Sequence, residues 1–374
     1  MTKKLLFILN EPTYFVSHRL PIALAAQQAG YTIHVATGFQ IPPAEIIKAG
    51  FTYHFLPISR SGRNVFTEFK TLLAMIRLMQ QVNPKIVHLV TIKPVIYGSL
   101  AARIAHIPAV VAAVSGLGYA FIDQYTEARF LRYIISKLYR IAFQHPNLKV
   151  IFQNIDDKNT LLKLGVLKEN QSVIIRGSGI DLNQYVHSDE PEISELNPPV
   201  IVMAARLLQD KGVVEYVEAA KLLRAQGINA RFLLAGHPDP GNPTSIDEDQ
   251  LEHWAQAGHI EYLGYCQNIP KLFSQAHVVV LPSYREGLPR VLAEAAACGR
   301  AVITTDVPGC RAAIIPEKTG LLVTVREHIR LAEAIRKLVT EHELRQMMGK
   351  EGRKLAEYEF DVNKVIGEHI NIYN

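Results

Sequence analysis

The sequence has few of the residues that build disulfide, zinc or membrane-spanning structures. Only three of its 374 residues are cysteines. Cys266, Cys298 and Cys310 are odd in number and lack CxxC spacing, so they predict neither a disulfide framework nor a zinc site. No apolar run reaches the roughly 18 residues that span a bilayer. The first run, Leu5 to Leu9, stops at Asn10 and is shorter than the core of a signal peptide, which needs about seven residues. We therefore expect the protein to stay in the cytoplasm.

Sequence motifs for common nucleotide and metal chemistry are also missing. No Walker sequence and no GxGxxG fingerprint occurs, which argues against a nucleoside triphosphatase or a dehydrogenase. The 14 histidines show neither HExxH nor another ligand-like spacing, so we expect no metal and no cofactor. His88 and His277 stand inside apolar runs, and we interpret both as core residues.

Charge is distributed unevenly along the chain. Residues 1–185 contain 20 basic and 9 acidic side chains, whereas residues 186–374 contain 20 basic and 26 acidic ones. A net-positive first half predicts contact with an anionic surface. The alternative, two surfaces that differ without functional meaning, stays open from charge alone. Nucleic acid is not favoured as the partner, because no arginine-rich tract or RNP-like aromatic run is present.

Short apolar runs alternate with segments of helical length throughout the sequence. The runs are apolar at every position, which predicts parallel strands buried on both faces, and the alternation predicts an α/β fold of βαβ units. Residues 187–199, HSDEPEISELNPP, are acidic, contain several prolines and separate two such series. We predict two doubly wound, Rossmann-like domains that face each other across a cleft, with ligands at the carboxyl ends of the strands. The predicted parts are a first domain at 1–186, a linker at 187–199, a second domain at 200–345, and C-terminal helices at 346–374 that could cross back to the first domain.

The segment 282–294, PSYREGLPRVLAE, carries the sharpest constellation. It follows an apolar run and predicts a helix that begins around Leu288, with proline tolerated in the first turn. Unpaired amides of residues 287–290 at such a helix start can cradle a phosphate. A carboxylate beside a phosphate repels it, so we expect Glu286 and Glu294 to reach neutral hydroxyls. The alternative is an acidic helix cap with Glu294 on a solvated face.

A second cluster, ARLLQDKG at 205–212, follows the first strand predicted for the second domain. Arg206 and Lys211 would both stand near the carboxyl end of that strand. Two cations there can hold a diphosphate and stabilise the charge that develops as it leaves. The alternative is two solvated basic side chains in a loop.

Together, ARLLQDKG and PSYREGLPRVLAEAAACGRAVITTDVPG resemble family 4 of the nucleotide-sugar glycosyltransferases, which are retaining enzymes with the two-Rossmann GT-B fold. The resemblance extends over nearly the whole chain, and its specific part is the Glu-x7-Glu motif. It implies that Arg206 and Lys211 bind the donor diphosphate. It also implies that Glu286 contacts the donor sugar and that Glu294 holds the ribose hydroxyls. The implied contacts to the donor phosphates and the nucleotide base are Gly287, Leu288, Pro289, Gly236, Gly264 and Tyr265.

The first half matches the family less closely. Residues 10–14 stand where many members have a glycine-rich loop, and Ser115, a candidate donor contact, stands where many have a histidine that faces the reacting sugar. Both departures recur in the branch that extends polyprenyl-diphosphate-linked sugars, which FVSHRLPIALA, VTIKPVIYGSLAARIA, VSGLGYAF and HPDPGNPTSI also resemble. The candidate contacts to an acceptor diphosphate are His18, Arg19, Lys93 and Tyr119. A solvated Lys93 or a buried, paired Arg19 is the open alternative.

Residues 129–142 have the periodicity of a basic amphipathic helix. At about 100° per residue, the apolar side chains gather on one face, and the basic ones, Arg129, Arg132, Lys137 and Arg140, on the other. Such a helix in a net-positive domain suits a protein that rests on anionic lipid. The alternative is an apolar face that packs on the sheet, with the basic residues merely solvated.

We therefore expect a cytoplasmic hexosyltransferase, peripheral on the inner face of the cell membrane. It would move a hexose or N-acetylhexosamine from a nucleotide donor, expected to be UDP-linked, to a polyprenyl-diphosphate-linked saccharide. Because the histidines show no metal-ligand spacing, we expect the transfer to need no metal. The family resemblance implies that it would retain the anomeric configuration. Two alternatives stay open: a nucleotide-sugar epimerase of the same build, which needs no acceptor, and a sugar-binding protein without catalysis.

Overall fold

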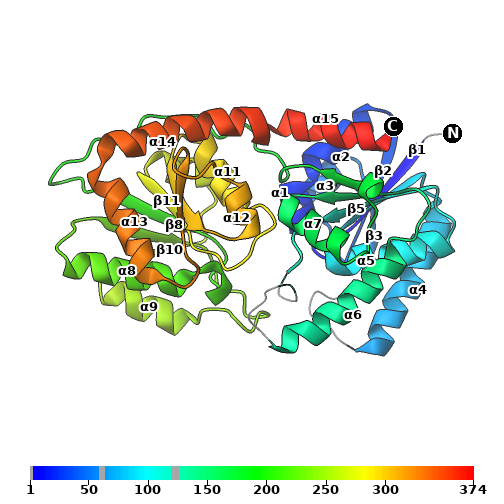
Figure 1. Cartoon of the computed structure of the whole chain (residues 1–374). Helices are drawn as coiled ribbons and strands as arrows, with labels where there is room; N and C mark the ends of the chain where they lie inside the picture. The colour runs from blue at the N-terminus through cyan, green and yellow to red at the C-terminus, as the bar shows by residue number, and fades with distance from the viewer. Residues whose placement is uncertain (1–2, 59–63, 119–120, 122–125) are drawn as a thin grey trace. The chain divides into compact units, whose positions relative to one another are not determined.

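The computed structural model describes residues 3–58, 64–118, 121 and 126–374, and the chain divides into two compact units (Figure 1). Unit 1 comprises Met1–Gly179 together with Val362–Asn374, and unit 2 comprises Ile180–Asp361. Each unit is built around its own parallel sheet.

Among the described residues, unit 1 contains a seven-stranded parallel sheet in the strand order three, two, one, four, five, six, seven. The strands are β1 (Lys3–Ile8), β2 (Tyr31–Thr37), β3 (Thr52–Phe55), β4 (Ile86–Val90), β5 (Ala109–Val114), β6 (Leu148–Phe152) and β7 (Ser172–Ile174). The helices are α1 (Pro12–His18), α2 (Leu20–Gln28), α3 (Ala44–Lys48), α4 (Val65–Val82), α5 (Ile92–Ile104), α6 (Thr126–Ala142), α7 (Ile155–Lys163) and α15 (Val362–Tyr373).

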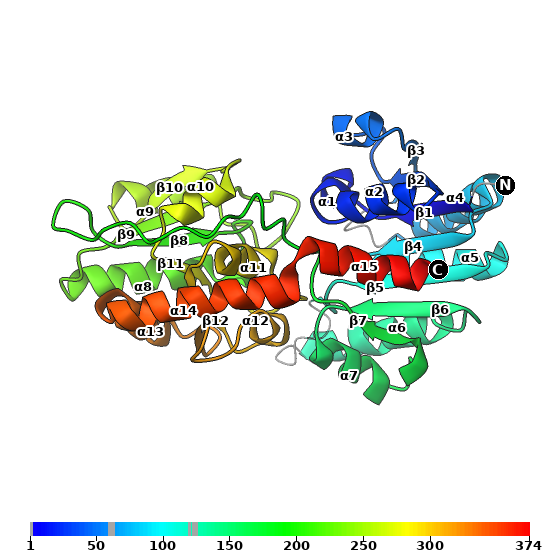
Figure 2. The ribbon, with the colours of Figure 1, turned by 90° about the horizontal axis from the view of Figure 1, so that it is seen from above.

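Helices cover both faces of the unit 1 sheet. Alternate residues of a strand point to opposite faces, and in β1 Leu6 and Ile8 pack into a core shared with α4, α5 and α6. Leu5 and Phe7 pack into a second core with α2 and α15, and Figure 2 shows α15 beside α2. Burial on both sides explains why Leu5–Ile8 of β1 are apolar at every position.

Unit 2 contains a six-stranded parallel sheet in the order β10-β9-β8-β11-β12-β13, and the described chain is continuous through it. The strands are β8 (Val200–Ala204), β9 (Arg231–Ala235), β10 (Glu261–Gly264), β11 (Val278–Leu281), β12 (Ala301–Thr305) and β13 (Gly320–Val323). The helices are α8 (Val213–Ala225), α9 (Glu248–Gln256), α10 (Ile269–Ser274), α11 (Arg290–Ala297), α12 (Pro308–Ala312), α13 (His328–Thr340) and α14 (His342–Leu355). Two parallel α/β sheets confirm the predicted pair of doubly wound, Rossmann-like folds.

The bounds of the two units differ from those predicted. Unit 2 begins at Ile180, not after 186, because the Ile180 amide donates to the Phe360 carbonyl at 2.7 Å and joins the chain to the end of unit 2. It also includes α14, beyond the predicted end at 345. The last helix, α15, belongs to unit 1, where the Tyr31 hydroxyl donates to the Tyr373 carbonyl at 2.7 Å.

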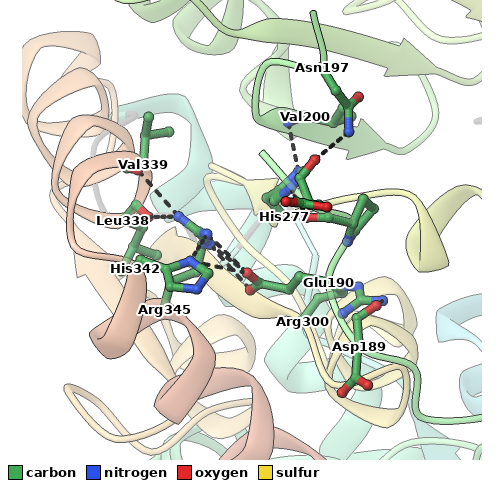
Figure 3. Close-up of polar contacts among 12 residues, drawn as sticks. Asp189, Glu190, Asn197, Val200, His277, Arg300, Leu338, Val339, His342 and Arg345 are labelled. Atoms are coloured by element: carbon green, nitrogen blue, oxygen red, sulfur yellow. Dashed lines mark hydrogen bonds and ion pairs between the residues drawn. The ribbon is translucent and has the colours of Figure 1, made fainter. Parts of the chain in front are cut away.

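The prediction of a linker at 187–199 is wrong, since this segment is part of unit 2 (Figure 3). Its Glu190 carboxylate pairs with the fully buried Arg345, whose Nη2 lies 2.9 Å from Glu190 Oε2. Arg300, also buried, donates to the Ser188 carbonyl at 2.9 Å and to the Ser188 hydroxyl at 2.6 Å. Acidic composition indicated a solvated segment, but here the carboxylate and carbonyls satisfy arginines that the core of unit 2 buries.

His277 also anchors this segment and is a core histidine, as predicted. Its Nδ1 accepts the Val200 amide at 2.9 Å, so its Nε2 carries the proton and donates to the Pro191 carbonyl at 3.0 Å. Burial lowers the pKa of His277, which favours the neutral ring that this pair of bonds requires.

Replacing Glu190 should destabilise unit 2. In Glu190→Gln the buried Arg345 loses its counter-ion, and we expect the free energy of unfolding to fall by about 3 kcal/mol. Urea denaturation followed by circular dichroism measures this loss. Glu195→Gln removes an exposed carboxylate of the same segment and is the matched control. Equal urea midpoints for the two variants would show that the pair does not anchor the segment.

A buried histidine cluster joins α15 to the sheet of unit 1, and His88 is a core residue, as predicted. His88 Nδ1 and the Tyr373 hydroxyl lie 2.5 Å apart. The ring of His369 stacks on His88 with 5.7 Å between centroids. Burial, together with the nearby Arg19 guanidinium, lowers the pKa of His369 to about 3.

Unit 1 should lose stability as the pH falls below about 6.5. The pKa of His369 is about 6.5 in the unfolded chain and about 3 in the native protein. Between these two pH values the unfolded chain binds a proton at His369 that the native ring does not bind. Each such proton lowers stability by up to about 1.4 kcal/mol per pH unit. Melting temperatures measured from pH 7.5 to 4 should therefore fall less steeply in His369→Gln than in the wild type. The exposed-histidine variant His253→Gln should keep the wild-type slope, and an unchanged slope in His369→Gln would contradict the assignment.

Candidate active site

The switch point of the unit 2 sheet gathers most of the residues predicted to bind the donor. In the strand order, the direction of the connections reverses between β8 and β11, and ligands of doubly wound sheets bind at the carboxyl ends of the strands beside such a point. Arg206 and Lys211 follow β8, Glu286 follows β11, Gly236 follows β9, and Gly264 ends β10. The structure thus brings these predicted residues to one edge of one sheet.

A glycine lets the loop after β8 approach the end of β11. Gly212 has a φ of 77°, in the left-handed region that favours glycine. A Cβ at this position would clash with the carbonyl oxygen of Pro282. The backbone amide of Tyr284 donates to the Asp210 carbonyl at 2.9 Å and ties the two loops together. Lys211, between Asp210 and Gly212, is therefore held beside the end of β11.

The two loops meet in an ion pair between Lys211 and Glu286. Lys211 Nζ and Ser283 Oγ both donate to Glu286 Oε1, the latter at 2.8 Å, and both charged side chains are largely buried. Gly309 lies against the backbone of Glu286, where a Cβ would clash with the Glu286 carbonyl. The sequence predicted both charged residues at this edge, and their direct pairing emerges only from the fold.

Arg206 lies at the more exposed side of the same edge. Its Nη1 donates to Asp239 Oδ2 at 2.8 Å, and about half of its side chain is exposed. An exposed ion pair of this kind contributes about 0–1 kcal/mol to the stability of the fold. An anionic ligand could therefore take the place of Asp239 at small cost.

Helix α11 begins at Arg290, two residues later than the sequence pattern predicts, with Pro289 at the N-cap. Gly287, Leu288 and Pro289 form the buried turn between β11 and this helix. Within the described chain the Leu288 amide donates no hydrogen bond. It lies at the positive end of the helix dipole, where it can donate to an anion.

Glu294 lies one and a half turns into α11 and is only 8% exposed, which excludes the alternative of a solvated face. Its Oε1 accepts hydrogen bonds from the Tyr185 hydroxyl and from Arg290 Nε, each at 2.7 Å. Tyr185 is not among the residues predicted from the sequence, because it lies 109 positions from Glu294 and carries no motif. The Arg290–Glu294 pair has the i, i+4 spacing that could have signalled the second contact.

Gly236 and Gly264 join the ends of β9 and β10. The Gly236 amide donates to the Gly264 carbonyl at 2.8 Å, and a Cβ on Gly236 would clash with the Ala205 carbonyl. Beyond them the exposed Tyr265 stacks on His237, with 5.5 Å between centroids and 5° between ring planes. Such a pair offers a stacking surface for a nucleotide base.

Of the residues predicted to contact an acceptor, His18 ends α1 and Lys93 lies in the first turn of α5. His18 stacks on Tyr14, with 4.1 Å between ring centroids, and its Nδ1 lies 2.7 Å from Ser17 Oγ. Lys93 pairs with Glu68 at 2.5 Å. Tyr119 lies outside the described residues.

Arg19 does not lie on the surface of unit 1, so the prediction that it contacts an acceptor is wrong for this structure. The side chain is buried, its Nη1 donates to the His18 carbonyl at 3.0 Å, and its charge faces the His88 and His369 cluster. Arg19 is thus the buried residue that the alternative interpretation described.

Three polar side chains follow three neighbouring strands of unit 1: Asn10 after β1, Thr91 after β4 and Ser115 after β5. Among the described residues, Asn10 Oδ1, Thr91 Oγ1 and Ser115 Oγ are buried without a hydrogen-bond partner. Thr91 has φ 74° and ψ 163°, a conformation that is nearly restricted to glycine and that concentrates at ligand sites. Ser115 is among the residues predicted from the sequence and Thr91 is not, since residue type does not reveal backbone strain.

The predicted basic amphipathic helix is α6, and its apolar face is divided. Ile135 and Leu138 pack against the core of unit 1, whereas Ile134 and Ile141 are exposed. The basic side chains have different surroundings: Arg132 lies over the Phe121 ring, Lys137 over the Tyr133 ring, and Arg140 donates to the Leu164 carbonyl at 3.0 Å. The side chain of Arg129 lies outside the described residues.

The described part of the chain contains neither a cluster of metal ligands nor a membrane-spanning helix. No group of three or more His, Cys, Asp or Glu side chains there is arranged to hold a metal ion. No helix there has both the length and the apolarity that crossing a membrane requires.

Two protein-family models match the chain. Residues 187–355 match glycosyl transferases group 1, and residues 4–154 match a glycosyl transferase 4-like model. The sequence is 32% identical, over 84% of each chain, to the N,N'-diacetylbacillosaminyl-diphospho-undecaprenol alpha-1,3-N-acetylgalactosaminyltransferase of Campylobacter jejuni. It is 27% identical to the capsular polysaccharide biosynthesis glycosyltransferase CapM of Staphylococcus aureus, over 86% of this chain and 84% of CapM.

Solved structures share the fold. The chain is similar to Anabaena Alr3699/HepE in complex with UDP, with a TM-score of 0.75 and 16% identity, covering 99% of this chain and 98% of the other. These similarities confirm the predicted GT-B fold class and the predicted family resemblance.

Proposed function

The chain belongs to the group 1 glycosyltransferases, and from this premise we propose that it transfers a hexose or N-acetylhexosamine from a UDP-linked donor to a polyprenyl-diphosphate-linked saccharide. The observation that carries the proposal is that Lys211, paired with Glu286, and Arg206 all lie at the switch point of the unit 2 sheet. The UDP in the Alr3699/HepE complex supports the donor nucleotide. The diphospho-undecaprenol acceptor in the name of the Campylobacter relative supports the acceptor class.

In this proposal the donor lies along the carboxyl edge of unit 2. Its diphosphate accepts from Lys211, from Arg206 and from the Leu288 amide at the start of α11, while Glu286 accepts from a sugar hydroxyl. Glu294 binds the ribose hydroxyls, and the base lies by Gly236, Gly264 and Tyr265. Ser115, with Asn10 and Thr91, is the unit 1 candidate for contacts to sugar hydroxyls, because their buried oxygens have no partner among the described residues.

We propose that the transfer retains the anomeric configuration. The bond from the anomeric carbon to the diphosphate breaks, and the acceptor hydroxyl forms its bond on the same face. The departing diphosphate takes the acceptor's proton. Lys211 and Arg206 stabilise the charge that builds on the leaving group, so they supply the positive charge without a metal ion. The α product in the name of the Campylobacter relative supports retention, since UDP-N-acetylhexosamines carry their sugar in α linkage.

Lys211→Ala should lower the rate of sugar transfer by about 10²–10³-fold, because the leaving diphosphate loses its buried cation. Transfer is followed as UDP release from UDP-N-acetylgalactosamine in the presence of an undecaprenyl-diphosphate-linked saccharide. Lys221→Ala removes a partly exposed lysine of the same unit and should keep wild-type rates. A near-normal rate in Lys211→Ala would remove the diphosphate role. Conversion of the donor without acceptor would favour an epimerase.

We further propose that unit 1 rests on an anionic membrane surface, where a polyprenyl-linked acceptor is held. At the start of α4, Phe66 and Phe69 are 81% and 59% exposed. Asn64 Oδ1 accepts the Phe66 amide at 2.9 Å and fixes this first turn. The excess of basic residues in 1–185 and the exposed Lys137 on α6 add attraction to anionic lipid.

Phe66→Ser combined with Phe69→Ser should weaken binding to vesicles of phosphatidylglycerol and phosphatidylethanolamine by roughly tenfold or more, because exposed aromatic area no longer enters the interface. Vesicle co-sedimentation measures the loss. Leu196→Ser removes a nearly fully exposed apolar side chain from unit 2 and is the matched control. If the double variant and the control sediment alike, the start of α4 is not the membrane contact.

A further inference from the structure

From the described residues, Glu294 receives hydrogen bonds on one of its two carboxylate oxygens. Tyr185 Oη and Arg290 Nε both donate to Oε1 at 2.7 Å. Among the residues that the structure describes, Oε2 receives none of the hydrogen bonds made to this side chain. A carboxylate arranged in this way has one oxygen fixed by the protein and one oxygen able to accept from a ligand.

Tyr185 can act only as a hydrogen-bond donor to this carboxylate. It is 5% exposed, and burial together with the neighbouring Glu294 charge raises the pKa of its phenol far above the usual value. The hydroxyl therefore keeps its proton at any physiological pH. Its hydrogen bond to an ionised carboxylate belongs to the stronger, charge-assisted class.

A partly buried arginine connects the backbone of Tyr185 to the helix that carries Glu294. Arg353 Nη1, from α14, donates to the Tyr185 carbonyl and to the Ala297 carbonyl at the end of α11, each at 2.8 Å. The Tyr185 amide donates to Asp181 at 2.9 Å. Tyr185 thus approaches Glu294 from a separate segment of the chain. The Arg353 guanidinium holds that segment against the end of α11.

We propose that Tyr185 is a positioning residue for recognition of the nucleotide ribose. By holding Glu294 Oε1, it fixes the carboxylate so that Oε2 accepts from the ribose hydroxyls of the donor. This inference rests on the proposed function, in which Glu294 binds ribose. Arg290 donates to the same oxygen from within α11. Tyr185 donates to it from a different direction, and the two bonds together fix the orientation of the carboxylate.

Tyr185→Phe removes this hydroxyl and keeps the ring, so it tests the proposal directly. Binding of UDP and of 2′,3′-dideoxy-UDP, which lacks both ribose hydroxyls, is measured by isothermal titration calorimetry. We expect the wild type to bind UDP more tightly than the dideoxy compound. In Tyr185→Phe, affinity for UDP should fall roughly tenfold and affinity for 2′,3′-dideoxy-UDP by less than twofold (about the resolution of the measurement), so that the preference between them shrinks.

Enzyme kinetics give a second readout. Because ribose contacts are the same in the ground state and the transition state, the KM for the UDP-sugar should rise by the same factor while kcat stays within about twofold. Glu294→Gln should lose the ribose preference as well, and adding Tyr185→Phe to it should have little further effect, as expected for residues that act through one another.

The matched control is Tyr216→Phe, in the same unit. The Tyr216 hydroxyl is also buried and donates to the carbonyls of Ile201 and Leu233, and it does not touch Glu294. This variant should lower the melting temperature and keep the preference for UDP over 2′,3′-dideoxy-UDP.

Two outcomes separate this inference from the proposed function. If the wild type prefers UDP and Tyr185→Phe keeps the same preference, the positioning role is wrong while the proposed function stands. If the wild type binds neither nucleotide, the proposed function fails and the inference fails with it. A preference lost equally in Tyr185→Phe and Tyr216→Phe would also overturn it, because general loosening of unit 2 would then explain the effect.

Discussion

The chemistry of unit 2 depends on the close approach of the loop after β8 to the loop after β11, where Lys211 meets Glu286. Two glycines make this approach possible: Gly212 lies under Pro282 and Gly309 lies against the backbone of Glu286, and neither position has room for a Cβ. A lysine held beside a carboxylate is fixed in place before any ligand arrives. Little reorganisation is then left for the reaction itself, which is the condition under which charges stabilise a transition state most effectively.

Two buried arginines and a partly buried one organise the segments around this edge. Arg345 and Arg300 hold 188–190 on unit 2, and Arg353 holds Tyr185 against the end of α11. Removing such groups from water has a cost, which is recovered only where acceptors surround the guanidinium. Arg300 and Arg353 donate to backbone carbonyls of segments distant in the sequence, and Arg345 pairs with the distant Glu190 carboxylate. These bonds hold irregular chain in place that no strand or helix fixes.

Much of the architecture was predictable from local sequence. Runs such as Val278–Leu281, apolar at every position, indicate strands buried on both faces, and the strand order then brings Arg206, Lys211 and Glu286 to one edge. The acidic, proline-containing segment 187–199 was wrongly predicted as a linker. Composition reports whether a segment can be solvated, but not whether a buried arginine elsewhere in the chain will bind it.

The sequence by itself determined the α/β class, the two series of parallel strands and the turn that carries Glu286, because each depends on neighbouring residues and on periodicity. Only the tertiary structure decided which partners the functional side chains have. Tyr185 reaches Glu294 from 109 positions away, Arg19 turns inward toward His88 and His369, and Thr91 adopts a strained backbone. These outcomes arise from packing between distant segments, and hydrogen bonds across such distances leave no local pattern in the chain.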